Sequence, residues 1–257
     1  MSASAGRNRE PEREQRRASA SCPLGLCDGS GFLVDEQTST ASDCGCRAGR
    51  IAAGRTRSLA GRIPKRYRGV SFERPPVSDM ARVAPEHVRL VRRYVQDIEQ
   101  NLERGKGLWI EGDVGTGKTT LAMLVSKAAL DTGHSVAIYS LPRLLSLLRD
   151  SMDAEGGLLD FLDRLSAVDL LHIDDLGAEN RTDWALEQLY SIVNTRYEAQ
   201  RAIVATTNLM PDDLSERLGP RTVSRLVEIC GDPIPLYGRD RRREFRPEHM
   251  ELISPNA

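Results

Sequence analysis

Beyond Gly105, short apolar runs alternate with longer segments in which apolar residues recur at helical spacing. Such runs predict strands of a parallel sheet, because helices cover both faces of these strands. The runs are GLWIEGD, SVAIYS, VDLLHIDD, RAIVATTN and PIPLYG. The segments that predict helices include KTTLAMLVSKAALDTG, PRLLSLLRDSM and TDWALEQLYSIVNTRYEA, the last capped by Thr182. The alternation predicts an α/β fold with a parallel sheet and helices on both faces.

The part of the chain before Gly105 follows other patterns. The N-terminal tail is rich in Arg, Glu and Ser and lacks the apolar stretch of a secretory signal. Residues 85–105 have apolar positions at helical spacing and predict one amphipathic helix, with Pro85 in its first turn. The parts we expect are a disordered tail at 1–20, a cysteine module at 21–50, a basic linker at 51–83, the core at 84–246 and a C-terminal tail at 247–257.

The overall composition and charge say little about the class of function, whereas local clusters of basic residues are informative. Hydrophobic residues make up 40% of the 257 residues, which supports a substantial core. The 36 basic and 37 acidic residues nearly cancel, so overall charge predicts no partner. Basic residues gather between Arg47 and Arg74 and in GRDRRREFR, where they could bind phosphate backbones or form solvated linkers. No apolar run approaches the roughly 20 residues that span a bilayer, so we expect a cytoplasmic protein without a membrane partner.

The cysteine module contains two close pairs of thiols. Cys22 and Cys27 form the first pair, Cys44 and Cys46 form the second, and a strand-like GFLVD lies between them. A hairpin that brings two such pairs together makes a tetrahedral site suited to Zn²⁺. In so small a segment the metal would contribute most of the folding free energy. Redox-active thiols and plain structural cysteines are the alternatives.

The stretch GDVGTGKTT predicts a nucleotide site, because it follows a predicted strand and opens a predicted helix. Glycines let successive backbone N–H groups turn toward a phosphate, and the helix N-terminus adds partial positive charge. Lys118 would reach the β- and γ-phosphates, and the Thr119 hydroxyl would ligate Mg²⁺. The candidate nucleotide-binding residues are Gly112, Asp113, Val114, Gly115, Thr116, Gly117, Lys118, Thr119 and Thr120.

Two adjacent carboxylates end the third predicted strand. Asp174 is placed to bind Mg²⁺ through water, and Asp175 is the candidate base that activates the attacking water. Asp175 is one methylene shorter than Glu, so we expect slow intrinsic hydrolysis, with Glu179 as the reserve base. Asn208, at the end of the fourth strand, could orient water against the γ-phosphate. No guanine-reading Asn-Lys-x-Asp element follows, which favours ATP.

Arginines near the C-terminal end of the core form another candidate group. If Pro220 begins a helix, Arg221 and Arg225 lie one turn apart on the same face. Such a face can present a guanidinium to the γ-phosphate held by a neighbouring subunit, which implies a homo-oligomer. The alternative is a solvated basic helix.

Together these motifs resemble the DnaC/DnaI-type helicase loaders, a clade of P-loop AAA+ ATPases that also includes the IstB transposition helpers. The strings that carry the resemblance are IPKRYRGVSFE, GDVGTGKTTLA, YSLPRLLSLLR, LLHIDDLGAE, ATTNL, GPRTVSRLVEI and LYGRDRRRE. The resemblance implies that Asn208 is sensor 1 and that Arg225 is the arginine finger in trans, with Arg221 second. It also implies a sensor-2-like role for Arg242.

The resemblance further implies a function. Loaders of this family place a replicative, DnaB-type helicase on single-stranded DNA, and some carry an N-terminal zinc module that grips the helicase. Low aromatic content, 5% of the chain, implies that single-stranded DNA would be held mainly through phosphates and therefore in a salt-dependent way. An IstB-like transposition helper is the closest alternative. An adaptor that binds ATP or DNA without turnover is a third.

Overall fold

The chain divides into two compact units, residues 1–55 and 56–257, each described here by itself. The computed structural model describes residues 22, 24–27, 29–35, 40–47, 63–152, 157–178 and 181–240. Both predicted tails, 1–20 and 247–257, therefore lie outside the described residues.

The first unit is built on a hairpin. Strands β1 (Phe32–Asp35) and β2 (Thr40–Asp43) pair antiparallel, with Phe32 opposite Asp43. The buried cluster beside the hairpin consists of three cysteines, with a fourth cysteine and Leu33 packed against it. So few apolar side chains cannot supply a core of ordinary size, and the thiols occupy the place where one would be.

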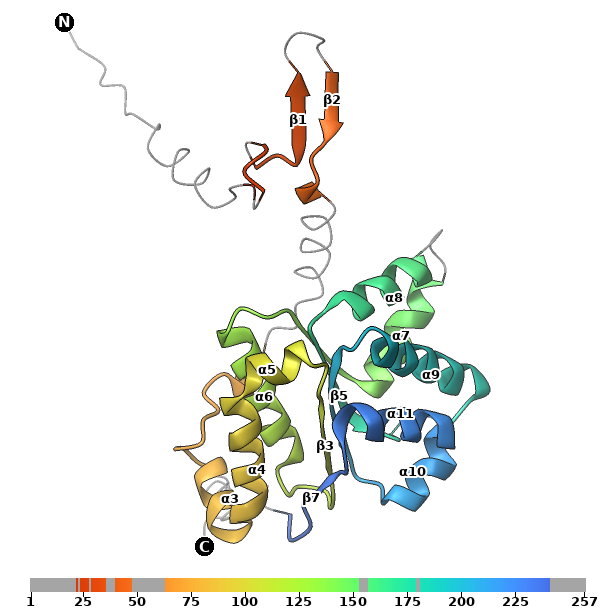
Figure 1. Cartoon of the computed structure of the whole chain (residues 1–257). Helices are drawn as coiled ribbons and strands as arrows, with labels where there is room; N and C mark the ends of the chain where they lie inside the picture. The colour runs from red at the N-terminus through yellow and green to blue at the C-terminus, as the bar shows by residue number, and fades with distance from the viewer. Residues whose placement is uncertain are drawn as a thin grey trace, which may run out of the picture. The chain divides into compact units, whose positions relative to one another are not determined.

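The second unit is built on a sheet of five strands in which all neighbours run parallel (Figure 1). In sheet order the strands are β4 (Val136–Ser140), β5 (Leu170–Leu176), β6 (Ala202–Thr207), β3 (Leu108–Glu111) and β7 (Ile234–Pro235). This sheet confirms the predicted fold class. Because β3 and β5 flank β6, the carboxyl ends of the strands that carry the predicted motifs meet at one edge.

Helices cover both faces of the sheet, and each face has its own buried cluster. The helices of the first face are α3 (Val77–Val83), α4 (Pro85–Gln96), α5 (Ile98–Glu103) and α6 (Lys118–Asp131). Those of the second are α7 (Leu141–Ser151), α8 (Gly157–Ala167), α9 (Asp183–Glu198), α10 (Pro211–Leu218) and α11 (Pro220–Cys230). Successive strand residues alternate between clusters, so that Ile110 packs with the first and Trp109 with the second.

The structure differs from the sequence-based elements at several points. The helix predicted at 85–105 is two helices, α4 and α5, which are separated at Asp97. The predicted linker, 51–83, contains a 3-10 helix (η1, Lys65–Tyr67) and α3, whose Val77 and Met80 are buried. These apolar side chains hold the segment against the core despite its basic composition. Helices α8 and α10 were not predicted.

Two predicted helix starts are confirmed. The Thr182 hydroxyl caps α9 by accepting the Ala185 N–H, and α11 begins at Pro220. None of the helices described here is both long and apolar enough to cross a membrane.

The buried side chain of Arg196 hydrogen-bonds to the backbone of α8 and to the starts of two neighbouring strands. The Arg196 guanidinium on α9 is fully buried and donates hydrogen bonds of 2.7–3.1 Å to four backbone carbonyls. The acceptors belong to Leu165, Val168, Asp169 and Ala202. Planar guanidinium groups are suited to such multiple donation. The contact fixes where β5 and β6 begin, and with them the strand ends that form the site.

Candidate nucleotide site and cysteine cluster

The loop between β3 and α6 has the backbone conformation that its glycines permit. Gly112, Gly115 and Gly117 have φ values of 135°, 79° and 106°, a region that L side chains rarely adopt. A Cβ atom at Gly112 would overlap the carbonyl oxygen of Leu236. Glycine is therefore required here by both conformation and space, which explains the motif in physical terms.

Lys118 lies inside this loop at the N-terminus of α6. Its side chain is 5% exposed, and its ammonium donates to the carbonyl oxygens of Gly112 at 2.9 Å and Asp113 at 2.6 Å. Thr116 also braces the loop, because its hydroxyl donates to the Asp113 carbonyl at 2.9 Å. A fixed ammonium beside the positive end of a 14-residue helix is suited to an anion such as phosphate.

The predicted magnesium ligands are brought together. The Thr119 hydroxyl on α6 donates to the Asp174 carboxylate on β5, 2.9 Å from Oδ1 and 3.2 Å from Oδ2. The sequence separation of 55 residues makes this a contact of the tertiary fold. A hydroxyl and a carboxylate are the hard oxygen ligands that Mg²⁺ takes beside nucleotide phosphates, so these residues fit the ion.

Strand β5 is irregular where its two carboxylates lie. Its register against β6 shifts between Ile173 and Leu176, and Asp175 has φ 58°. A bulge of this kind turns a side chain out of the strand's regular alternation, and Asp tolerates the left-handed conformation better than most residues. Asp174 and Asp175 therefore do not simply point to opposite faces as in a regular strand.

Thr206 links both carboxylate residues, and the sequence reading missed it. Its hydroxyl donates to Asp174 Oδ1 at 2.6 Å and accepts the Asp175 N–H at 3.0 Å. Thr206 lies on β6, the strand beside β5, and is fully buried. The string ATTN does show a hydroxyl residue near the end of the strand. The string cannot show which residue this hydroxyl bonds to, because that depends on which strand lies beside β6.

The remaining predicted residues have different positions. Asn208 directly follows β6, next to the strand of Asp174, and its side chain is exposed. Glu179 and Arg242 lie outside the described residues.

The chain beyond β7 runs alongside the phosphate loop. The Leu236 N–H donates to the Glu111 carbonyl at 2.7 Å, and the Gly238 N–H donates to Asp113 Oδ2 at 3.0 Å. The Tyr237 hydroxyl donates to Glu111 Oε1 at 2.9 Å. These contacts place the start of the basic segment GRDRRREFR beside the loop, which the sequence pattern did not indicate.

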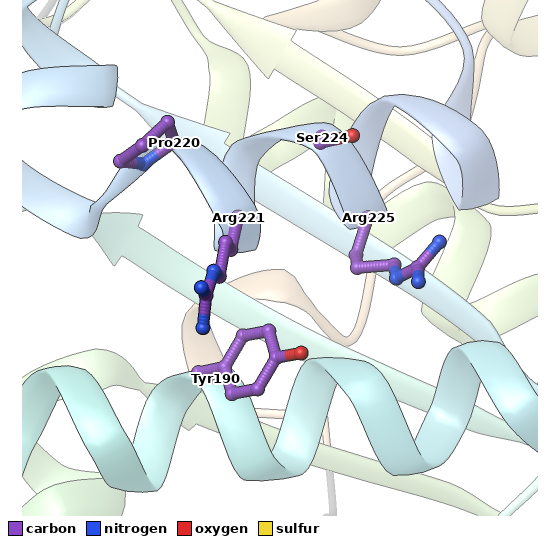
Figure 2. Close-up of a pocket in the computed structure, with 5 residues that line it drawn as sticks. All are labelled: Tyr190, Pro220, Arg221, Ser224 and Arg225. Atoms are coloured by element: carbon purple, nitrogen blue, oxygen red, sulfur yellow. The ribbon is translucent and has the colours of Figure 1, made fainter.

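The two candidate arginines line one pocket of about 430 Å³ with Tyr190, Pro220 and Ser224. Figure 2 shows Arg221 extending from α11 toward Tyr190 of α9, while Arg225 extends along α11. Arg225 pairs with Glu228 at 2.8 Å and lies 4.1 Å from the ring centre of Tyr197. Arg221 is exposed and makes no ion pair with the residues described here. The helix face predicted from the one-turn spacing is therefore present.

The four cysteines of the first unit converge on one point. Their Sγ atoms all lie within 4.8 Å of one another, with Cys22 and Cys44 separated by 3.8 Å and Cys27 and Cys46 by 3.6 Å. A tetrahedral zinc site with zinc–sulfur bonds of about 2.3 Å requires sulfur atoms about 3.8 Å apart. The four thiols thus fit zinc in chemistry and in spacing.

The thiols also affect one another's ionisation. Burial opposes ionisation of Cys22, but backbone N–H groups of Cys27, Leu26 and Leu24 lower its pKa to about 6. Burial and the neighbouring thiols raise the pKa of Cys46 to about 12. Four thiolates in such proximity repel one another, and a divalent cation would offset that repulsion.

Comparison with known proteins places the nucleotide site in a family. The family model for IstB-like ATP binding proteins matches residues 90–226, from α4 into α11. The replicative helicase loader DnaI of Bacillus subtilis (strain 168) is 24% identical over 190 residues, which are 68% of this chain and 58% of DnaI. The phage-like element PBSX protein XkdC of the same organism is 28% identical over 219 residues, 80% of this chain and 78% of XkdC. This chain thus spans little more than half the length of DnaI.

A solved structure agrees with these sequence matches. The crystal structure of the DnaC helicase loader superposes with a TM-score of 0.58 at 30% identity, covering 68% of this chain and 100% of that one. The family match covers more than half of the 257 residues and contains Lys118, Asp174 and Asn208. This protein is therefore a member of the IstB-like ATP binding protein family, within the DnaC/DnaI-type clade of AAA+ proteins.

Proposed function

We propose that this protein binds ATP with Mg²⁺, hydrolyses it slowly, and acts as a loader of a replicative helicase. One observation carries the nucleotide part of the proposal. The Thr119 hydroxyl and the Asp174 carboxylate are 2.9 Å apart, beside a loop that holds the buried Lys118. In this proposal the backbone of residues 112–120 and Lys118 hold the phosphates, and Thr119 and Asp174 hold the ion. The ion would supply charge stabilisation at the phosphates.

Asp175 and Asn208 are proposed to handle the attacking water. Asp175 accepts the proton, and Asn208 orients the water from the adjacent strand end. The left-handed backbone of Asp175 and its N–H bond to Thr206 fix where the short carboxylate can reach. An Asp175→Asn variant is expected to bind ATP normally and to lose phosphate release. Unchanged phosphate release would transfer the role to Glu179.

We propose that the pocket of Figure 2 receives the terminal phosphate of a nucleotide held by a second copy of this chain. Arg225 is the proposed finger, and Arg221 lies beside it in the same pocket. Because Arg225 is paired with Glu228, contact with a phosphate requires this exposed pair to open, which costs little. Arg225→Ala is expected to retain ATP binding and lose hydrolysis, and Arg221→Ala is the matched comparison. Loss of hydrolysis in Arg221→Ala alone would make Arg221, and not Arg225, the finger.

The loader role rests on the family and on the first unit. Proteins similar to this chain are called replicative helicase loaders, and the four-cysteine module at 21–50 lies outside the family match at 90–226. We propose that this module binds zinc and contacts a DnaB-type helicase, while the core at 84–246 binds ATP and single-stranded DNA. Aromatic residues make up only 5% of the chain, so DNA contacts would be mainly to phosphates.

The experiment mixes the purified full chain with the replicative helicase of its own host, ATP and Mg²⁺, and follows the complex by size-exclusion chromatography. Helicase transfer onto circular single-stranded DNA is then measured as unwinding of an annealed strand. The Cys22→Ser/Cys27→Ser double variant is expected to lose the complex. Cys230→Ser, which changes a cysteine outside the cluster, is expected to keep it. Absence of a complex with the wild-type chain would refute the loader proposal.

An IstB-like transposition helper is the second candidate, and the match to XkdC, a protein of a phage-like element, favours keeping it. It predicts stimulation of a transposase on duplex DNA and no transfer of helicase. The third candidate, an adaptor without turnover, predicts no phosphate release under any condition. A phosphate-release assay with and without single-stranded DNA separates it from the other two.

A further inference from the structure

His172 is a buried polar residue in the middle of strand β5. Its side chain is 0% exposed, and its register partners on both sides, Ile138 of β4 and Val204 of β6, are apolar. Neither neighbouring strand therefore offers a side-chain hydrogen bond. An isolated polar group in such surroundings is costly, and an apolar residue would avoid the cost.

The polar contacts of His172 come from helix α6, which packs on the sheet, and from a later residue of β5 itself. Ser126 of α6, also fully buried, has its Oγ 2.8 Å from His172 Nδ1. Asp174, two residues along the strand, has its Oδ1 4.0 Å from His172 Nε2. Nε2 is buried and has no hydrogen-bond partner among the described residues.

These contacts select one tautomer of a neutral ring. The ring is fully buried, and burial favours its neutral form, which carries one proton. If the Ser126 hydroxyl donates to Nδ1, that proton is on Nε2 and points toward the carboxylate. The other tautomer would direct a lone pair of Nε2 at Asp174, which is electrostatically unfavourable in this buried place.

We propose that His172 is a positioning residue for the magnesium ligand Asp174, with Ser126 holding the imidazole in the tautomer that presents Nε2–H to the carboxylate. This inference rests on the proposed function. Asp174 already accepts hydrogen bonds from Thr119 and Thr206. His172 adds a third donor group behind them, at a distance that stabilises the charge through the low local dielectric without a formed hydrogen bond.

The consequence is a carboxylate held in one orientation before the ion arrives. Partners of metal-ligating groups commonly alter metal affinity by about 10–100-fold when they are removed. His172 touches neither the proposed nucleotide nor the ion, so its loss should change Mg²⁺ dependence more than nucleotide affinity in the absence of Mg²⁺.

Two substitutions separate the roles of the two ring nitrogens. His172→Asn keeps a polar group at the position of Nδ1 and removes the one at Nε2, whereas His172→Gln keeps the donor at Nε2. The experiment titrates Mg²⁺ into the full-length chain and follows binding of a fluorescent, non-hydrolysable ATP analogue. We expect half-saturating Mg²⁺ to rise on the order of tenfold in the Asn variant and to stay within about threefold of wild type in the Gln variant.

Equal shifts in both variants, or no shift in either, would overturn the positioning role. Binding of the analogue in EDTA should be the same in all variants, which shows that the loop and the fold are intact. A wild-type chain that binds no analogue with or without Mg²⁺ would instead refute the proposed function, and the role of His172 would fall with it.

A second measurement needs no substitution at the site. In a long-range proton–nitrogen spectrum of wild-type chain labelled with nitrogen-15 histidine, the His172 ring should show the Nε2–H tautomer. The chain has 4 histidines, and substitution of His87, His134 and His249 one at a time identifies the His172 resonance by elimination. The Nδ1–H tautomer would overturn the proposal even if every His172 variant failed to fold.

Discussion

The adjacent threonines of β6 provide a sharp test of how the site holds Asp174. Both are fully buried, and each hydroxyl makes two hydrogen bonds, but only the Thr206 hydroxyl bonds to Asp174 and Asp175. Thr206 donates to Asp174 at 2.6 Å and accepts the Asp175 N–H at 3.0 Å. Thr207 donates to the Leu176 carbonyl at 2.8 Å and accepts the Leu209 N–H at 3.1 Å. Substitution by Val removes both bonds and keeps the shape of the side chain.

The cost to stability should be similar for the two variants. Losing a buried hydroxyl and its bonds costs about 1–3 kcal/mol. For a unit of this size, each kcal/mol lowers Tm by roughly 2–4 °C, so a decrease of roughly 2–12 °C is expected in either case. Differential scanning calorimetry measures this directly. The comparison therefore controls for destabilisation, which is the usual ambiguity of a buried substitution.

The effect on the site should differ. Thr206→Val removes a donor from the proposed magnesium ligand, so half-saturating Mg²⁺ for binding of the ATP analogue should rise by about tenfold or more. Thr207→Val should leave half-saturating Mg²⁺ within about twofold of wild type, because the Thr207 hydroxyl bonds only to the backbone of Leu176 and Leu209. An equal rise in both variants, or none in Thr206→Val, would refute the claim that Thr206 fixes Asp174.

Three further predictions concern stability and metal. Arg196→Met should destabilise the second unit by about 3–5 kcal/mol, because four carbonyls lose a buried charged donor. Arg201→Met, which removes a half-buried residue paired with Asp169, should cost at most about 1 kcal/mol. Urea unfolding measures both losses, and equal losses would contradict the assigned role of Arg196. The pKa of Asp169 is lowered: burial raises it, but hydrogen bonds from Ser135 and the charge of Arg201 outweigh the effect of burial. The ionised Asp169 therefore stabilises the folded state at neutral pH. This stabilisation is lost as the pH falls below the ordinary pKa of 3.8 and through the lower pKa of the folded state, so Asp169→Asn should flatten the acid side of a plot of Tm against pH. The purified chain should contain about one zinc per molecule by elemental analysis, and Cys27→Ser should contain almost none; zinc-free wild-type protein that keeps the fold of its first unit would contradict a metal-held module.

Local patterns predicted the elements whose chemistry is local. The phosphate loop needs glycine at positions of positive φ, and a buried strand before it and a helix after it are visible as apolar runs and helical spacing. The same reasoning found Thr182 as a cap, Pro220 as a helix start and the two cysteine pairs. Each depends on residues that are neighbours in the chain, so the sequence contains the whole cause.

Other features depended on which segments become neighbours. The basic composition before α4 predicts a linker, whereas α3 buries Val77 and Met80 in a core that the local pattern does not show. The hydrogen bonds between Thr206 and Asp174 and between Ser126 and His172 join residues on different elements, and the packing of strands and helices decides that they meet. The sequence by itself determined the nucleotide loop, the carboxylate pair and the sheet that carries them. Only the tertiary structure decided which side chains hold the carboxylate, because buried polar groups take whatever partner the packing of strands and helices brings within reach.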